Sequence, residues 1–310
     1  MLKYEIKIES QGTITVIPDS QRLFGFLINK LKKYLSESSI TKLVIDVKSG
    51  KEMCMMSSLM PSGYVPTPKN YMLDSIDNEQ DRKEVYKSLK KRDYIKYEAL
   101  VEFRDKGSDM YMEKYLTKTR TFQQKFNLKS QSLSLDGYPN QAYTVPIIRI
   151  GNGTIREVKN FSFFVTVDEK SKMKEGLDSL DSDLCECGTM DCVLGPKGSY
   201  GYNCYEIQSI EKGACDFKFG KGKYLNLGML LPKEEVINWE DSYLEIYTSD
   251  RNSYDIYNEK KKVISFIKEG SVIDVANDAE FDCIGKSIAN PYNLLYRDAI
   301  VFGNSYFIGL

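Results

Sequence analysis

The chain has 310 residues, 42% of them hydrophobic, and its 43 basic and 44 acidic side chains leave a formal net charge of −1. This length allows one large or two ordinary domains, and no apolar run approaches the ~20 residues that a transmembrane helix needs. The sequence has no histidine. This excludes Ser-His-Asp and Cys-His catalysis and histidine-ligated metal sites, whereas carboxylate, lysine or tyrosine chemistry stays open.

The N-terminal segment predicts strands and one amphipathic helix. Alternating charged and apolar residues predict a strand over 3–9, and a second is expected over 12–17. Asp19 or Ser20 then caps a helix over 21–35, in which apolar residues recur with helical spacing. The segment lacks the apolar stretch of a signal peptide, so a cytoplasmic protein is expected.

The next elements complete an α+β pattern. A strand is expected at 41–47, a proline-punctuated loop at 51–70 and partly helical structure at 79–105. The order strand, strand, helix, strand favours helices on one face of an antiparallel sheet. The segment 114–130 is basic and carries two phenylalanines, Phe122 and Phe126.

Residues 131–160 predict a hairpin or extended loop, in which Arg149 and Arg156 are available to phosphates. A strong strand is expected at 161–167. An acidic, serine-rich segment follows at 168–191 and predicts a helix and then a surface insertion. The C-terminal third alternates again as strand–turn–strand, and the pattern as a whole suggests two α+β halves.

The seven cysteines allow two interpretations. Their odd number prevents complete internal pairing, and a cytosolic protein keeps its thiols reduced. Four of them in one glycine-rich region could form a closed zinc site, although the spacing C-x-C-x4-C-x11-C differs from paired C-x2-C motifs. Unliganded thiols are the alternative. The four are Cys185, Cys187, Cys192 and Cys204.

The stretch "FKFGKGKYLNLGMLLP" at 217–232 combines glycines, lysines and an aromatic residue ahead of an apolar run. Glycines let the backbone approach a phosphate chain, and lysines neutralise it. The stretch lacks G-x4-G-K-[ST], because Tyr224 follows Lys223, and this disfavours an NTPase. A plain hairpin turn is the simpler alternative.

Taken in order, five segments resemble one family in the RAMP superfamily of CRISPR proteins: the subunit that caps the crRNA 5′ end in type III-A (Csm) effector complexes. The resemblance spans nearly the whole chain. The segments are "DSQRLFGFLINKL", "MMSSLMPSGYVPTPK", "KKRDYIKYEALVEF", "FKFGKGKYLNLGMLLP", and "KVISFIKEGSVI" with the closing "YRDAIVFGNSYFIGL".

The resemblance implies an α+β fold of two ferredoxin-like (RRM-type) halves, taken as 1–130 and 131–310. It implies a thumb-like hairpin at about 131–160, and an acidic, cysteine-bearing insertion at about 168–204 is a departure from the family. The implied role is non-catalytic and needs no cofactor. The subunit would hold the crRNA 5′ handle and dock the large polymerase-domain (cyclase) subunit against the RAMP backbone subunits in antiviral defence, with no membrane contact.

The resemblance also implies which residues meet RNA. The glycine-lysine turn would cradle the handle, Arg149 and Arg156 would lie near the junction of handle and guide, and Ser57 and Ser58 could donate hydrogen bonds to RNA. For the two serines, a locally satisfied turn is an equal alternative. The residues of the turn are Lys218, Gly220, Lys221, Gly222, Lys223 and Tyr224.

Two other functions stay open at this point. A RAMP-type endoribonuclease that processes repeat RNA could use Tyr224 and nearby lysines as acid and base. A standalone α+β protein with no RNA ligand would use the glycine-lysine turn only as a hairpin.

Overall fold

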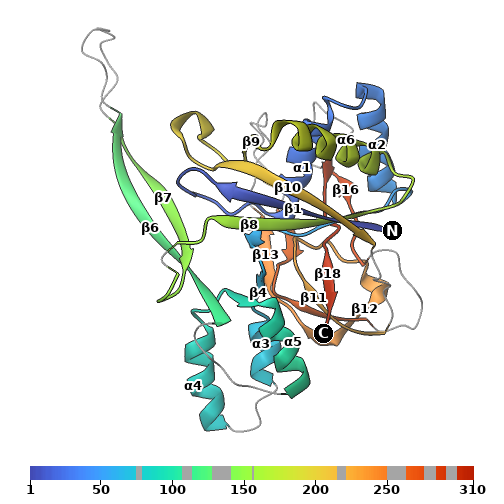
Figure 1. Cartoon of the computed structure of the whole chain (residues 1–310). Coiled ribbons are helices and arrows are strands. Elements are labelled where there is room, and N and C mark those ends of the chain that lie inside the picture. The colour runs from blue at the N-terminus through green and yellow to red at the C-terminus, as the bar shows by residue number, and fades with distance from the viewer. Residues whose placement is uncertain are drawn as a thin grey trace.

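The computed structural model describes residues 1–74, 79–106, 114–127, 141–155, 157–214, 221–249, 263–275, 284–290 and 299–310. Within these residues the chain forms two main antiparallel sheets, helices over the first sheet, a group of short helices and a long projecting hairpin (Figure 1). The predicted α+β class is therefore confirmed.

The first sheet, counted over the described residues, has six strands. They are β1 (Leu2–Ser10), β2 (Cys54–Met56), β3 (Met60–Pro61), β8 (Asn160–Val167), β9 (Met190–Val193) and β10 (Cys204–Ala214). Their order is β2-β8-β1-β10-β9, with β3 also paired to β8. Alternation along β1 buries Tyr4, Ile6 and Ile8 in the main core.

Three helices cover one face of this sheet (Figure 1): α1 (Ser20–Leu31), α2 (Glu37–Ser49) and α6 (Lys172–Cys187). Helix α1 begins where the sequence predicts it, because the Asp19 carboxylate accepts a hydrogen bond from the Arg22 amide at 3.0 Å. Its buried side carries Leu23, Leu27 and Leu31. This side packs into the main core.

Two strand predictions near the N-terminus are wrong. Residues 41–47 belong to α2, which Ser36 caps at the start and left-handed Gly50 ends. Ile40, Leu43 and Val47 are its buried residues, and this helical spacing and the caps outweigh the β-branched composition of the segment. Residues 12–17 form no strand, and Thr13 makes only an isolated bridge to Tyr202.

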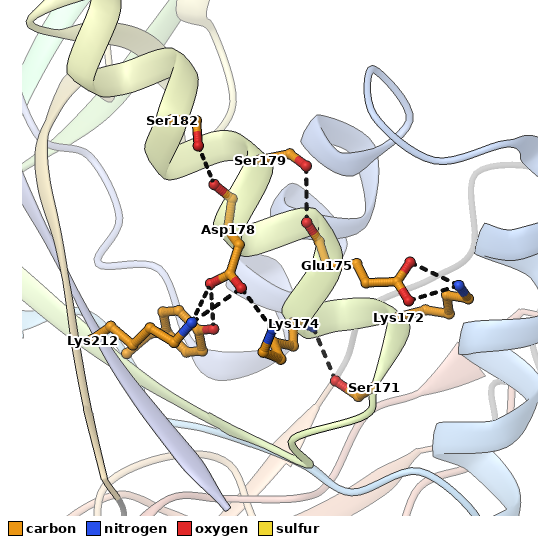
Figure 2. Close-up of polar contacts among 9 residues, drawn as sticks. Ser171, Lys172, Lys174, Glu175, Asp178, Ser179, Ser182 and Lys212 are labelled. Atoms are coloured by element: carbon orange, nitrogen blue, oxygen red, sulfur yellow. Dashed lines mark hydrogen bonds and ion pairs between the residues drawn. The ribbon is translucent and has the colours of Figure 1, made fainter.

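The acidic segment contains a core helix. Met173, Leu177, Leu180 and Leu184 of α6 are buried against the sheet. Asp178 adds a polar anchor, since it accepts hydrogen bonds from Tyr4 on β1 and from Lys212 on β10, at 2.7 and 2.8 Å. Figure 2 shows this cluster with Lys174. The helical part of the expected insertion is thus one layer of the first half.

The four strands of the second sheet follow the same order as β2-β8-β1-β10 of the first. Its strands are β11 (Gly222–Asn226), β12 (Ile237–Tyr243), β15 (Val272–Val275) and β18 (Phe307–Gly309), in the order β12-β15-β11-β18. If the short strand β3 and the edge strand β9 are left aside, β1 lies between β8 and β10 just as β11 lies between β15 and β18, which is the strand arrangement of a ferredoxin-like unit. Of the described residues, none after Cys187 is in an α-helix. Two strand pairs occur there instead: β13 (Ile246–Ser249) with β14 (Ile264–Ile267), and β16 (Ile288–Ala289) with β17 (Ile300–Val301).

The chain between β3 and β8 forms the parts that project. Its strands are β4 (Tyr64–Pro66), β5 (Tyr94–Lys96), β6 (Tyr115–Asn127) and β7 (Gln141–Gly151), and its helices are α3 (Lys69–Asp74), α4 (Glu79–Leu89) and α5 (Tyr97–Lys106). Strands β6 and β7 pair antiparallel over 117–127 and 141–151 and extend away from the body (left in Figure 1). The expected loop at 51–70 thus contains three short strands and the start of α3.

The first sheet takes strands from both sides of residue 130. The division into 1–130 and 131–310 stays a prediction about domain boundaries. Over the described part of the chain, no helix combines the length and apolar character needed to cross a membrane.

Candidate nucleic-acid interface

The described part of the glycine-lysine turn leads into β11. Lys218 and Gly220 lie outside the described residues, and Lys221 is exposed. Gly222 has a φ of +148°, a conformation that a side chain would strain. Tyr224 points into the core of the second sheet and is 8% exposed, so it offers no surface for stacking a base.

Lys223 lies against a pair of tyrosines. Its ammonium is 5.0 Å from the ring centre of Tyr243 and 5.8 Å from that of Tyr71, and the two rings meet edge to face. The Tyr243 hydroxyl donates to Asp74 at 2.6 Å, and this hydrogen bond is the main reason that the pKa of Tyr243 rises to about 12. The cluster ties the turn to α3 and fixes the direction of one lysine.

Ser57 and Ser58 lie in the buried seam between the halves. The Ser57 hydroxyl accepts from the Phe164 amide at 2.9 Å and donates to the Ser58 carbonyl at 3.0 Å. The Ser58 amide donates to the Leu227 carbonyl at 2.8 Å, which links the first half to the end of β11. The hydrogen bonds of the Ser57 hydroxyl are therefore local, whereas Ser58 lines the cleft at the base of the hairpin and its hydroxyl has no hydrogen-bond partner among the described residues. Contact of either serine with RNA stays a prediction.

Cations and an aromatic ring share one face of the projecting hairpin. Lys118, Arg120 and Phe122 alternate along β6, so their side chains leave the strand on the same side. The Arg120 guanidinium is 5.1 Å from the ring centre of Phe122, which is 62% exposed. Arg149 is exposed and pairs with Thr119 across the hairpin, so it lies on the opposite face.

A hairpin is present, but it begins earlier in the chain than the predicted range of 131–160. Its described strands are 115–127, which lies before that range, and 141–151, which lies within it. Arg156 lies outside the described residues. Lys118 and Arg120 are not among the predicted RNA-binding residues, although their alternation with Phe122 in "TKTRTFQQK" is a signal that the sequence contains.

A cleft of about 330 Å³ opens at the base of the hairpin. Lys118 and Arg120 form its cationic side, and Asp19 and Glu269 add negative charge. Tyr247, from β13, also lines it and is 37% exposed. The cleft therefore joins elements of both halves with the hairpin, beside the first turn of α1. It combines cations with an accessible aromatic ring, as single-stranded nucleic acids require.

Loop 194–203 supports the hairpin from the other side. Lys125 on β6 lies 4.7 Å from the ring centre of Tyr202, and Lys197 lies 4.5 Å from that of Tyr143 on β7. These contacts join the hairpin to the first half at a second point.

The four cysteines of the predicted zinc site lie on three different elements. Cys185 and Cys187 are exposed at the end of α6, Cys192 is buried on β9 and Cys204 is partly buried on β10. Across the described residues, no three cysteine or carboxylate side chains come together in a way that could hold a metal ion. Burial raises the pKa of Cys192 to about 12, so this thiol stays protonated at neutral pH.

Comparison with solved structures gives full-length similarity. The chain aligns over 100% of its length with 98% of a chain in the Csm1–Csm4 cassette in complex with pppApA, at a TM-score of 0.60 and 17% identity. It aligns likewise with 98% of a chain in the same cassette in complex with cA4, at 0.59 and 18%. It also aligns over its whole length with 99% of a chain in the Csm3–Csm4 subcomplex of the type III-A CRISPR-Cas interference complex, at a TM-score of 0.60 and 14% identity.

No protein-family model matches the sequence, and no curated protein matches it. The structural similarity defines the class of fold: the chain has the α+β, doubly ferredoxin-like architecture found in these CRISPR effector complexes, over its whole length. This confirms the predicted fold.

Proposed function

We propose that the chain is a non-catalytic subunit of a type III-A CRISPR effector complex, which holds the 5′ handle of the crRNA. It also docks the large polymerase-domain subunit to the backbone subunits. The observation that carries this proposal is the full-length similarity to chains of two different complexes, Csm1–Csm4 and Csm3–Csm4. Csm4 is the subunit that both complexes contain, so it is the counterpart we infer.

The geometry of the hairpin and the cleft supports an RNA ligand. Lys118 and Arg120 form a cationic face on the hairpin side of the cleft, although Asp19 and Glu269 balance the formal charge of the whole lining. Backbone binding needs such a local basic face rather than a basic total. Tyr247 and Phe122 offer aromatic surfaces beside these cations, on which splayed bases can stack. A handle of fixed sequence suits this kind of recognition.

The proposed role requires no acid–base catalyst. The sequence has no histidine, and Tyr224, the tyrosine that an endoribonuclease would recruit from the turn, is buried. Burial withholds this hydroxyl from a bound strand. The observation favours binding over cleavage.

The first experiment is co-expression of the tagged chain with its candidate neighbours, followed by sequencing of the bound RNA and mass spectrometry of the bound proteins. We expect RNAs that share one short 5′ sequence, together with a large polymerase-like subunit and a backbone subunit. Recovery of the chain with neither RNA nor these subunits would contradict the proposal.

The second experiment tests the surface. The double variant Lys118→Ala/Arg120→Ala should weaken binding of handle RNA at least ~10-fold and reduce the salt slope by about 2. Lys42→Ala, an exposed lysine on α2, is the matched control and should change neither. An equal loss of RNA affinity in the double variant and in Lys42→Ala would mean that the cleft is not the binding site. Cleavage of repeat RNA by the purified chain would support the endoribonuclease instead.

A further inference from the structure

A second hollow lies on the solvent face of α1. It is a groove of about 460 Å³ between the helix and the end of β9, a volume comparable to small-ligand sites. Four helical residues line one wall: Arg22, Gly25, Phe26 and Asn29. Their spacing of three and four places them on one face, opposite the leucines that enter the core.

The facing wall is held rigidly by one buried asparagine. Val193, Leu194 and Gly195 line this wall, and the Leu194 amide donates to the Asn203 carbonyl at 3.0 Å. The Asn203 side chain accepts from the Thr15 amide at 2.8 Å and donates to the Pro196 carbonyl at 2.9 Å. A Cβ on Gly195 would meet this side chain at 2.7 Å, so loop and asparagine pack closely. The groove is therefore preformed rather than dependent on a ligand.

The chemistry of the groove suits one unpaired nucleotide. The partly buried ring of Phe26 supplies an aromatic surface and Asn29 an amide that can pair with a base edge. Gly25 leaves the helix backbone open, because an added Cβ there meets nothing within 4 Å. Arg22 provides positive charge at one end and Lys30, 5.9 Å from the Phe26 ring centre, at the other. Asp19 lies 3.9 Å from Arg22 Nε, and Lys30 Nζ donates to the Asp191 carbonyl at 2.9 Å.

The groove and the cleft meet at the first turn of α1. Asp19 lines the cleft and caps the helix, and Arg22, on the first turn, lines the groove. A strand that occupies the cleft therefore reaches the groove without crossing a separate surface.

We propose that this groove binds one splayed base of the single-stranded RNA that occupies the cleft, with Phe26 as the stacking surface and Arg22 on the adjoining phosphate. The inference rests on the proposed function, because it extends the same RNA path. It assigns a specific role to the solvent face of α1, opposite the leucines that enter the core.

Gly25 allows a test that keeps the fold. Leucine in place of Gly25 projects into the groove and is a better helix former, so Gly25→Leu should fill the site without lowering the melting temperature. We expect ~10-fold weaker binding of handle RNA for Gly25→Leu and Phe26→Ala, in line with the loss of one stacked base. Gly25→Ala, which adds one methyl group, is the matched control and should stay within ~2-fold of the wild type.

Photo-crosslinking identifies the base. RNAs with 4-thiouridine placed at one position at a time should give a crosslink to the tryptic peptide that contains Phe26 from a single position, and Gly25→Leu should abolish it. If Lys118→Ala/Arg120→Ala weakens RNA binding but Gly25→Leu does not, and no crosslink forms on α1, the inference about the groove is overturned while the proposed function stands. The inference is also overturned if Gly25→Leu releases a protein neighbour and leaves RNA binding unchanged. If the wild type binds no RNA, the proposed function and this inference both fail.

Discussion

The two sheets share the order of four strands, β2-β8-β1-β10 in the first and β12-β15-β11-β18 in the second, but differ in what covers them. The first sheet carries α1, α2 and α6 on one face, and its helices bring their own apolar residues to the core (Figure 1). The second sheet has no such layer among the described residues, and its core includes Met53 and Met55 from the edge of the first half. The comparison teaches that the same topology can be stabilised by its own helices or by a neighbouring sheet.

Strand β2 shows how this sharing works. Cys54 and Met56 belong to the core of the first sheet, whereas Met53 and Met55, the alternate residues, belong to the core of the second. Met56 also exchanges backbone hydrogen bonds with Asn304 and Tyr306, each at 3.0 Å. The second half is thus built onto the first, and we expect the two to unfold together.

The largest expected effect on stability comes from weakening the packing of a helix against the first sheet. Leu177 on α6 is fully buried, so Leu177→Ala should lower the free energy of unfolding by about 3–4 kcal/mol through the lost burial and the cavity. Ile45→Ala, at a 39% exposed position of α2, should cost less than about 0.5 kcal/mol. Urea denaturation measures both. Similar small losses in the two variants would mean that α6 contributes little to the core.

In the second half, a buried polar side chain contributes to the stability that buried helices give the first. The fully buried Asn226 amide donates to the carbonyls of Gly228 and Lys268, each at 2.9 Å, and holds two chain reversals in place. Asn226→Ala leaves these carbonyls without that donor and should lower the free energy of unfolding by about 2–3 kcal/mol.

The control for this prediction is Asn238→Ala, at a partly exposed position of β12 where water can replace the lost bonds; it should cost under about 1 kcal/mol. Urea denaturation followed by fluorescence compares the two. If Asn226→Ala were neutral, backbone pairing and apolar contacts alone would hold the second sheet.

The seam between the halves gives the next prediction. Ser57→Ala removes the acceptor of the Phe164 amide from a buried position and should lower the free energy of unfolding by about 1–2 kcal/mol. Under conditions where the variant stays folded, its affinity for handle RNA should remain within ~2-fold of the wild type. A loss of RNA affinity with unchanged stability would instead favour the RNA contact predicted from the sequence.

The sequence predicts what depends on local periodicity. The spacing of Leu23, Leu27 and Leu31 and the cap at Asp19 give α1 correctly, and the apolar run at 161–167 gives β8. The strand predicted at 41–47 is wrong because the β-branched residues of this segment are typical of strands, whereas the caps at Ser36 and Gly50 favour a helix. Residue composition and helix capping therefore carry different information about the same segment.

The candidate site was harder to predict because it is assembled from distant segments. Lys118, Asp19 and Tyr247 come from a hairpin, a helix cap and the second half, and only the fold brings them to one cleft. Ser57 and Tyr224 belong to segments that suggest RNA binding, yet both are buried. A motif read along the chain gives residue types and order but not which side chains reach the surface.

The smallest expected effect concerns the anchor of α6, and it depends on pH. Partial burial raises the pKa of Asp178, but hydrogen bonds from Lys174, Lys212 and Tyr4 outweigh this and lower it to about 2, from an ordinary value of 3.8 (Figure 2). The ionised carboxylate therefore stabilises the folded state above pH 4, and this contribution is lost as pH falls from about 4 toward 2.

Because the Asp178 side chain is 34% exposed, solvent screening limits its contribution, and Asp178→Asn should cost about 1 kcal/mol at pH 7. The difference between wild type and variant should shrink as pH falls from 4 to 3. Glu186→Gln, at an exposed position of the same helix, is the control and should show no such trend. Urea denaturation at a series of pH values measures these free energies. A difference that stays constant down to pH 3 would mean that the carboxylate holds α6 by shape and hydrogen bonding rather than by its charge.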